Sequence, residues 1–128
     1  MARKPSTTLT EAELRLMAVL WERGPSTVGE ITAALPPPPI AYNSVLTTMR
    51  ILEQKGYVEH EEQGRAFVCR TLVQREDAAK SAVGHVLSRF FDNSASSLAL
   101  RLIENERPSS DELRRLRALI DQYEEGAK

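Results

Sequence analysis

The chain has 128 residues, 41% of them hydrophobic, and a formal net charge of −1 at neutral pH. This length predicts one domain, or one domain with an appendage, and the near-neutral charge gives no general affinity for nucleic acid, although a local basic patch is compatible with it. The single cysteine, Cys69, excludes an internal disulfide and any metal site built on paired cysteines. No apolar stretch approaches the ~20 residues of a membrane helix and no signal-peptide pattern follows the basic start, so we expect a soluble, cytoplasmic protein.

Two capping boxes mark the first two helices. In each box a threonine hydroxyl can bond the amide three residues later while a glutamate bonds the threonine amide, as Thr10 with Glu13 and Thr27 with Glu30 allow. The first helix should end at Gly24 and the second at the proline run of residues 36–39. The expected buried side chains are Leu14, Met17, Ala18 and Trp21 in the first helix, and Val28, Ile31 and Leu35 in the second.

A third helix is expected from about Asn43 to Gln54, with Lys55-Gly56 as its carboxyl-terminal stop. Its apolar face carries Val45, Met49 and Leu52. Two alternating segments rich in β-forming residues, "YVEHEE" and "RAFVCRTL", follow on either side of Gln63-Gly64 and predict a two-stranded hairpin with its turn at this dipeptide. Helical patterns then run from about Gln74 to the end, interrupted at "DNSAS" and "ERPSS".

This order of elements predicts a mainly α fold with two parts. Residues 1–73 have the order of a winged helix-turn-helix, namely three helices and a β-hairpin wing, and residues 74–128 form a helical dimerisation region. The last helices are too short to cover their own apolar side chains, so we expect a symmetric dimer rather than a large wet patch on one chain. The expected dimerisation residues are Val86, Phe90, Leu98, Leu102, Leu113, Leu116, Ile120 and Tyr123.

The polar side of the third helix has two interpretations. Asn43, Thr47 and Arg50 are either an ordinary solvated face or the base-contacting face of a DNA-recognition helix, and the succeeding hairpin favours the second. Tyr42 and Ser44 at the helix start could then hold phosphates. Arg65, after the predicted turn, would enter the minor groove or hold a phosphate, and Arg70 is equally compatible with either role or with none. The expected partner is double-stranded DNA.

No catalytic constellation is recognisable in the sequence. There is no nucleophile paired with a base and no glycine-rich phosphate loop, so we expect no enzyme activity and no cofactor. His60, His85 and Cys69 lack the spacing of metal ligands, which predicts no metal site and favours buried structural roles for all three.

The blocks "LWERG" and "AYNSVLTT", with the wing "GRAFV", are similar to those of the penicillinase-repressor (BlaI/MecI/CopY) family, and the resemblance covers nearly the whole chain. It implies a winged-helix homodimer that represses transcription from a palindromic operator, in an antibiotic- or stress-response operon. The segment "SLALRLIENERPSSDELRRLRALI" resembles the family's dimerisation tail. A protein-interaction module that uses a winged helix without binding DNA is the alternative, and the near-neutral charge supports it.

The resemblance also marks departures from the family pattern. Antibiotic-responsive members are cleaved at an Asn-Phe bond under the control of a membrane sensor-protease pathway, and the matching pair here is Arg101-Leu102. Copper-responsive members end in a cysteine cluster that this chain lacks. Ile51 stands where many members have arginine, and Cys69 lies near the usual wing tyrosine. The differences at Ile51 and Cys69 imply an operator that differs from the family's common one.

Overall fold

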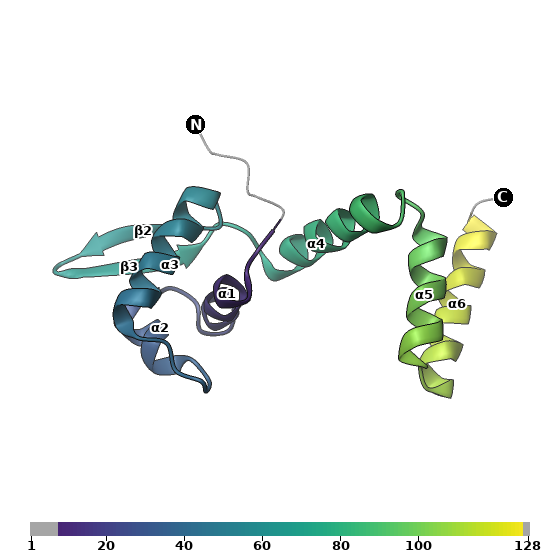
Figure 1. Cartoon of the computed structure of the whole chain (residues 1–128), viewed down its shortest axis with the longest axis horizontal. Helices are drawn as coiled ribbons and strands as arrows, with labels where there is room; N and C mark the ends of the chain where they lie inside the picture. The colour runs from purple at the N-terminus through teal and green to yellow at the C-terminus, as the bar shows by residue number, and fades with distance from the viewer. Residues whose placement is uncertain (1–7, 127–128) are drawn as a thin grey trace. The chain divides into compact units, whose positions relative to one another are not determined.

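The computed structural model describes residues 8–126, which form helices and a small sheet (Figure 1). The chain separates into two compact units, Met1–His85 and Val86–Lys128, and the division falls within α4. In chain order the elements are α1 (Glu11–Arg23), β1 (Ser26–Thr27), α2 (Val28–Ala34), α3 (Tyr42–Lys55), β2 (Val58–Gln63), β3 (Ala66–Thr71), α4 (Arg75–Phe90), α5 (Ala95–Glu106) and α6 (Ser110–Gly126). No helix among these residues has the length and apolar character needed to cross a membrane.

Both capping boxes predicted at the starts of α1 and α2 are confirmed. At α1, the amide of Glu13 donates to the Thr10 hydroxyl at 3.2 Å, and the amide of Thr10 donates to the Glu13 carboxylate at 2.8 Å. The corresponding distances for Thr27 and Glu30 at α2 are 3.1 Å and 2.9 Å. Each box satisfies two amides that the first helical turn would otherwise leave unpaired.

The core of the first unit lies between α1, α2, α3 and the sheet. The predicted apolar stripes of α2 and α3 are buried, with Ile31, Val45 and Leu52 fully inaccessible. The predicted buried face of α1 is partly wrong, because Leu14 is 47% exposed while Leu16 and Leu20 are buried. Helix α1 is apolar almost all the way round from Leu14 to Trp21, so two helical stripes fit its sequence equally well.

The sheet has three antiparallel strands in the order β1-β3-β2, rather than the two strands of the predicted hairpin. The additional strand, β1, pairs Ser26 with Cys69 and Thr27 with Val68. Two residues carry no period-two pattern, and Thr27 also caps α2, so sequence periodicity could not reveal this strand. Its pairing covers the edge of β3 that the hairpin alone would leave open.

The start of α4 is held to α1 by a single tryptophan. The indole nitrogen of Trp21 donates to the carbonyl of Val73 at 2.9 Å. The guanidinium of Arg75 lies 5.4 Å from the centre of the same indole ring, within the range of a cation–π contact. These two contacts therefore fix the first turn of α4 against α1.

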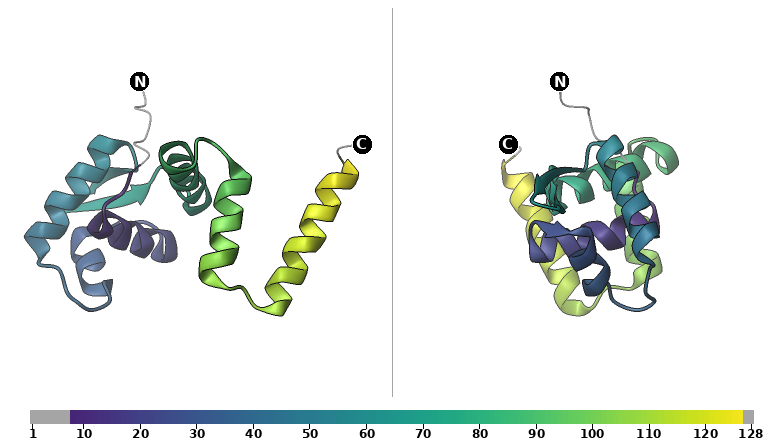
Figure 2. Two further views of the ribbon diagram at one scale, coloured as in Figure 1. Left: turned by 45° about the vertical axis from the view of Figure 1, so that its right-hand side comes forward. Right: turned by 90° about the vertical axis from the view of Figure 1, so that its left-hand side faces the viewer.

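In the second unit, α5 and α6 run antiparallel and diverge away from the connection between them (Figure 2). The hydroxyl of Ser94 caps α5, as one of the two expected candidates, by accepting from the amide of Ser97 at 3.2 Å. None of the described residues 86–126 is buried. Large apolar side chains remain exposed on both helices, for example Leu102 at 50% and Ile120 at 56%.

Candidate nucleic-acid interface

Helix α3 presents one polar face to solvent because its opposite face is anchored in the core. Val45, Met49 and Leu52 are at most 3% exposed, which fixes the rotation of the helix. Asn43, Thr47 and Arg50, on the other side, are all exposed. They recur at spacings of four and three residues and therefore lie along one face of the helix.

The amino terminus of α3 is open. Its capping residue, Ala41, provides no side-chain hydrogen bond, and the amide of Val45 donates the first bond of the helix, to the carbonyl of Ala41 at 3.0 Å. The amides of Tyr42, Asn43 and Ser44 therefore precede the hydrogen-bonded part of the helix. These amides and the positive end of the helix dipole are suited to a phosphate oxygen, and the exposed Tyr42 lies beside them.

Thr47 faces solvent with its hydroxyl proton already committed. The hydroxyl donates to the carbonyl of Asn43 at 2.9 Å, and Thr48 makes the equivalent bond to the carbonyl of Ser44 at 2.8 Å. Such bonds to the residue four positions earlier occupy the only donor of a threonine side chain. Thr47 therefore offers its methyl group and a hydroxyl lone pair, but no hydrogen-bond donor.

Arg50 is the cation of this face. It is exposed, and among the described residues no hydrogen bond or ion pair occupies its guanidinium. An unpaired guanidinium keeps its full set of donors for a base edge or a phosphate.

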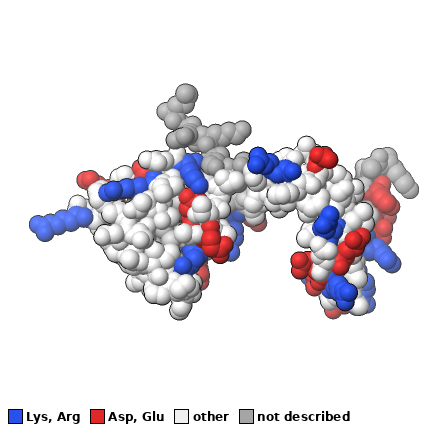
Figure 3. All heavy atoms as spheres, viewed as in Figure 1, with Lys and Arg blue, Asp and Glu red and all other residues white. Residues whose placement is uncertain are grey.

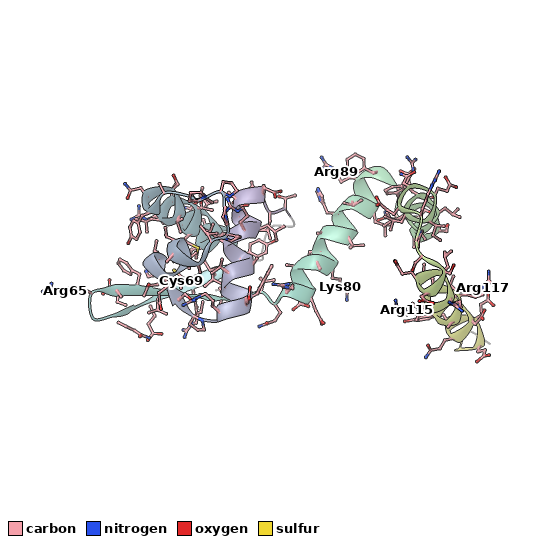
Figure 4. The ribbon with its side chains drawn as sticks, turned by 90° about the horizontal axis from the view of Figure 1, so that it is seen from below. Arg65, Cys69, Lys80, Arg89, Arg115 and Arg117 are labelled. Carbon is pink, nitrogen blue, oxygen red and sulfur yellow. The ribbon has the colours of Figure 1, made fainter. Side chains whose placement is uncertain are left out.

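The β2–β3 hairpin, called the wing below, carries a second unpaired cation. Its turn consists of Gly64 and Arg65, because Gln63 still pairs with Ala66 in the sheet. The turn predicted at Gln63-Gly64 was therefore misplaced by one residue. Gly64 has a φ of 65°, which is accessible to glycine without strain and places it first in the turn. Arg65 projects from the end of the wing with no partner among the described residues (Figure 4).

Arg70 has a different role from Arg65. Its Nε donates to a carboxylate oxygen of Glu59 at 2.5 Å, and its Nη1 lies 3.4 Å from a carboxylate oxygen of Glu61. Glu59 is its direct partner across the two strands. Arg70 therefore offsets part of the negative charge of two acidic residues on the wing that would otherwise repel a phosphate backbone. On the face drawn in Figure 3, basic and acidic side chains are interspersed.

The segment that leads into α3 is fixed by a residue that sequence patterns did not indicate. The guanidinium of Arg15, on α1, donates to the carbonyl of Pro36 at 2.6 Å and also to that of Pro38. These contacts join residues more than 20 positions apart, and no local periodicity encodes them. Arg15 thereby holds the connection between α2 and α3 against α1.

The carboxyl end of α3 is fixed by a buried ion pair, which the sequence also did not indicate. The Nζ of Lys55 lies 2.7 Å from a carboxylate oxygen of Glu13, whose side chain is only 4% exposed. Gly56 follows with a φ of 91°, and its left-handed conformation confirms the predicted stop. Lys55 therefore joins the last turn of α3 to the first turn of α1.

Of the three residues considered for structural roles, only Cys69 is buried; His60 is exposed and His85 partly exposed, so burial was the wrong expectation for His60. His60 and Cys69 are direct partners across the strands. Nδ1 of His60 instead lies 2.5 Å from a carboxylate oxygen of Glu53 on α3. Among residues 8–126 no group of three His, Cys, Asp or Glu side chains is placed to hold a metal ion.

Three helices, a three-stranded sheet with a projecting hairpin, and an exposed polar face on α3 define a winged-helix fold. A solved structure titled "Structure of reduced AbfR bound to DNA" shares this fold with a TM-score of 0.50, at 20% identity, over 75% of this chain and 74% of the other.

The sequence profile of the penicillinase repressor family matches residues 9–122, and the chain belongs to that family. It is 25% identical to the penicillinase repressor of Bacillus licheniformis, over 94% of both proteins. It is 20% identical to the methicillin resistance regulatory protein MecI of Staphylococcus aureus, over 88% of this chain and 93% of that protein. The protein is therefore a DNA-binding transcriptional repressor and not an enzyme.

Proposed function

We propose that this repressor binds a palindromic operator as a homodimer, in the cytoplasm, with residues 1–73 as the DNA-binding domain and residues 74–128 as the dimerisation region. The observation that carries the DNA-binding assignment is the polar face of α3, with an open helix start and an unpaired Arg50. Arg50 reads a base, with Thr47 and Asn43 beside it. Tyr42, Ser44 and Arg65 hold the phosphate backbone.

The hydrogen-bonding groups that each side chain has free indicate whether it contacts a base or the phosphate backbone. Arg50 can donate two bonds to a guanine, and Asn43 can pair with an adenine edge. Thr47 lacks a free donor, so it contacts a thymine methyl group or accepts from a base amino group. Arg65 stands on a separate element from α3 and has no base-reading neighbour, which suits contact with a phosphate or with the minor groove.

We also propose how the repressor is released from its operator. Control by a membrane sensor-protease pathway in an antibiotic- or stress-response operon follows from the family resemblance. Arg101 and Leu102, which match the family's cleavage position, lie inside α5, and Leu102 is half exposed. The guanidinium of Arg101 lies 6.0 Å from the ring centre of Phe91. Cleavage between Arg101 and Leu102 would require α5 to open locally, because a helical backbone engages its own amides and carbonyls.

Substitution of Arg50 by alanine should weaken binding to the selected operator by about 1–3 kcal/mol and weaken binding to unrelated DNA by less. The reason is that a base contact contributes only where the correct base is present. Fluorescence anisotropy with an operator selected from genomic fragments, and with a scrambled duplex of the same composition, measures both losses. Equal losses on the two duplexes would show that Arg50 contacts only the backbone.

Substitution of Arg65 by glutamine should weaken binding to all DNA sequences by a similar amount, unlike the substitution of Arg50. Removing one phosphate contact lowers the steepness of the plot of log affinity against log salt by about 0.9 per contact, whatever the DNA sequence. Anisotropy titrations over a series of salt concentrations measure this slope for the wild type and the variant. A sequence-dependent loss with an unchanged slope would place Arg65 on a base instead.

A further inference from the structure

A cleft of about 450 Å³ lies between α3, the start of α2 and the inner face of the wing. Its floor is made by the buried side chains of Met49 and Cys69, and its walls include Leu46 and Phe67. The volume falls within the range of roughly 300–1,000 Å³ that small-molecule sites occupy. Neither the DNA-binding role of α3 nor the packing of the core requires an open cleft at this position.

The walls of the cleft are suited to a flat ring. Phe67 is 45% exposed although it stands on the wing face that points to α3. One side of its ring meets His60 edge to face, with ring centres 5.2 Å apart, so the other contacts of the ring are open to a ligand. The thioether of Met49 adds a polarisable surface that packs well against aromatic rings.

The hydrogen-bonding state of the polar side chains at the rim indicates which of them can bind a ligand. Glu53 and His60 both line the cleft, but they contact each other at 2.5 Å and so satisfy one another. Arg50 also lines the cleft and has no partner among the described residues. Arg50 is therefore the one of these three groups whose hydrogen-bonding atoms are unused, and a carboxylate is the group that a guanidinium binds with two parallel hydrogen bonds.

The floor of the cleft argues against a soft metal ion as the ligand. Burial, together with the negative charge of Glu53, raises the pKa of the Cys69 thiol above its ordinary value of 9.0. The sulfur is therefore protonated at neutral pH and behaves as a small apolar group rather than as a metal ligand. Figure 4 shows Cys69 on the body of the sheet, well back from Arg65 at the tip of the wing.

We propose that this cleft binds a small aromatic carboxylate, with the ring between Leu46 and Phe67 above Cys69 and the carboxylate on Arg50. A consequence follows that rests on the proposed function: a ligand that occupies Arg50 removes a DNA contact, so it acts as an inducer. The cleft and the DNA-reading face share this one side chain, which makes binding of the ligand and binding of the operator mutually weakening.

Titration of the full-length protein with 1-naphthoate, followed by calorimetry, tests the site itself. We expect saturable binding, binding of the neutral analogue 1-naphthalenemethanol about tenfold weaker, and a similar tenfold loss in Arg50→Gln, because each change removes a charged hydrogen-bonding pair. Arg65→Gln is the matched control, since it removes an exposed cation outside the cleft, and it should bind 1-naphthoate like the wild type. Equal binding of the acid and the alcohol, or equal losses in the two variants, would overturn the proposal.

Cys69 provides a second measurement, with a chemical readout in place of a calorimetric one. It is the single cysteine of the chain and lies on the floor of the cleft, so its alkylation by N-ethylmaleimide reports on occupancy. 1-Naphthoate should slow alkylation of the wild type, and Arg50→Gln should need about ten times the concentration for the same slowing. An alkylation rate in the wild type that 1-naphthoate does not change would contradict binding in this cleft.

The regulatory consequence is measured separately with labelled operator. 1-Naphthoate should raise the protein concentration needed for half-saturation of the DNA, and 1-naphthalenemethanol should not. If the acid binds the free protein with the expected Arg50 dependence but leaves DNA binding unchanged, the site stands and its role as an inducer site is wrong. If the protein binds no DNA under any salt condition, the proposed function fails while the calorimetric result on the site is unaffected.

Discussion

Substitution of Lys55 by methionine should lower the free energy of unfolding by about 3 kcal/mol at neutral pH, because it leaves the carboxylate of Glu13 charged and buried. The Glu13 side chain is 4% exposed, and its pair with Lys55 is 2.7 Å long. Lys55 keeps 26% of its side chain exposed, so we place the loss at the lower end of the range for broken buried pairs. Methionine retains an apolar stem, which limits the change in packing.

The effect of Lys55→Met should depend on pH with a defined sign. Burial raises the pKa of Glu13, but hydrogen bonds from Lys55 and from the amide of Thr10 outweigh this effect and hold the pKa below its ordinary value of 4.5. A carboxyl group with a lower pKa in the folded state stabilises the protein above the unfolded pKa, and this stabilisation is lost as the pH falls through the folded pKa. The difference between wild type and variant should therefore narrow as the pH falls below 4.5.

Urea denaturation followed by circular dichroism, at equal protein concentrations, measures both the loss and its pH dependence. Arg23→Met is the matched control, because Arg23 pairs with Glu30 at 3.7 Å with both side chains about half exposed. Solvent screens such an exposed pair, so this variant should remain close to the wild type. Similar losses for the two substitutions would mean that the Lys55–Glu13 pair is energetically an ordinary surface pair.

Most of the architecture could be predicted because it is encoded locally. Thr10 and Thr27 mark two helix starts, because each bonds a glutamate only three residues later in the sequence. Gly56 marks the end of α3, because it adopts a left-handed backbone conformation. The apolar stripe of Val45, Met49 and Leu52 predicts which face of α3 is buried, and these three side chains are buried in the structure. In α1 nearly every residue from Leu14 to Trp21 is apolar, so the spacing of apolar residues could not select the buried face.

The parts of the candidate site that sequence patterns missed depend on contacts between distant residues. Arg15 holds the carbonyls of Pro36 and Pro38, and Lys55 holds Glu13 across 42 positions of sequence. Arg70 was compatible with a DNA contact until the strand register placed it beside Glu59. The residues of the polar face of α3 could be predicted from their spacing in the sequence. Only the structure shows that Arg50 has no partner among the described residues and that the Thr47 hydroxyl donates to the carbonyl of Asn43.

Substitution of Leu116 by glutamate should convert the protein from a dimer to a monomer at micromolar concentration. Leu116 lies on the stripe of α6 that also carries Leu113, Ile120 and Tyr123, and each of these side chains is 40% or more exposed in the single chain. Four large apolar side chains at helical spacing on an exposed face are typical of a surface that a second copy covers. A buried carboxylate in that interface would cost far more than a lost leucine contact.

Ala118→Glu provides the matched control for the dimer. Ala118 is exposed and lies two residues further along α6, about 200° around the helix from Leu116, so it carries the same charge on the opposite face. Sedimentation equilibrium should give twice the mass of one chain for the wild type and for Ala118→Glu, and the mass of one chain for Leu116→Glu. A monomeric wild type, or a Leu116→Glu variant that stays dimeric, would contradict the assignment of this face.

The monomeric variant should also bind a palindromic operator more weakly, by about 10²–10⁴-fold, because its two DNA-binding domains are no longer linked in one dimer. Its affinity for a single half-site should stay the same, since the winged unit has its own buried core, including Leu16, Ile31 and Leu52, and Leu116 lies outside it. Anisotropy titrations on full and half operators separate these effects. A loss of equal size on both duplexes would instead indicate that the substitution damages the winged unit, and the contribution of dimerisation to operator affinity would then be much smaller than we expect.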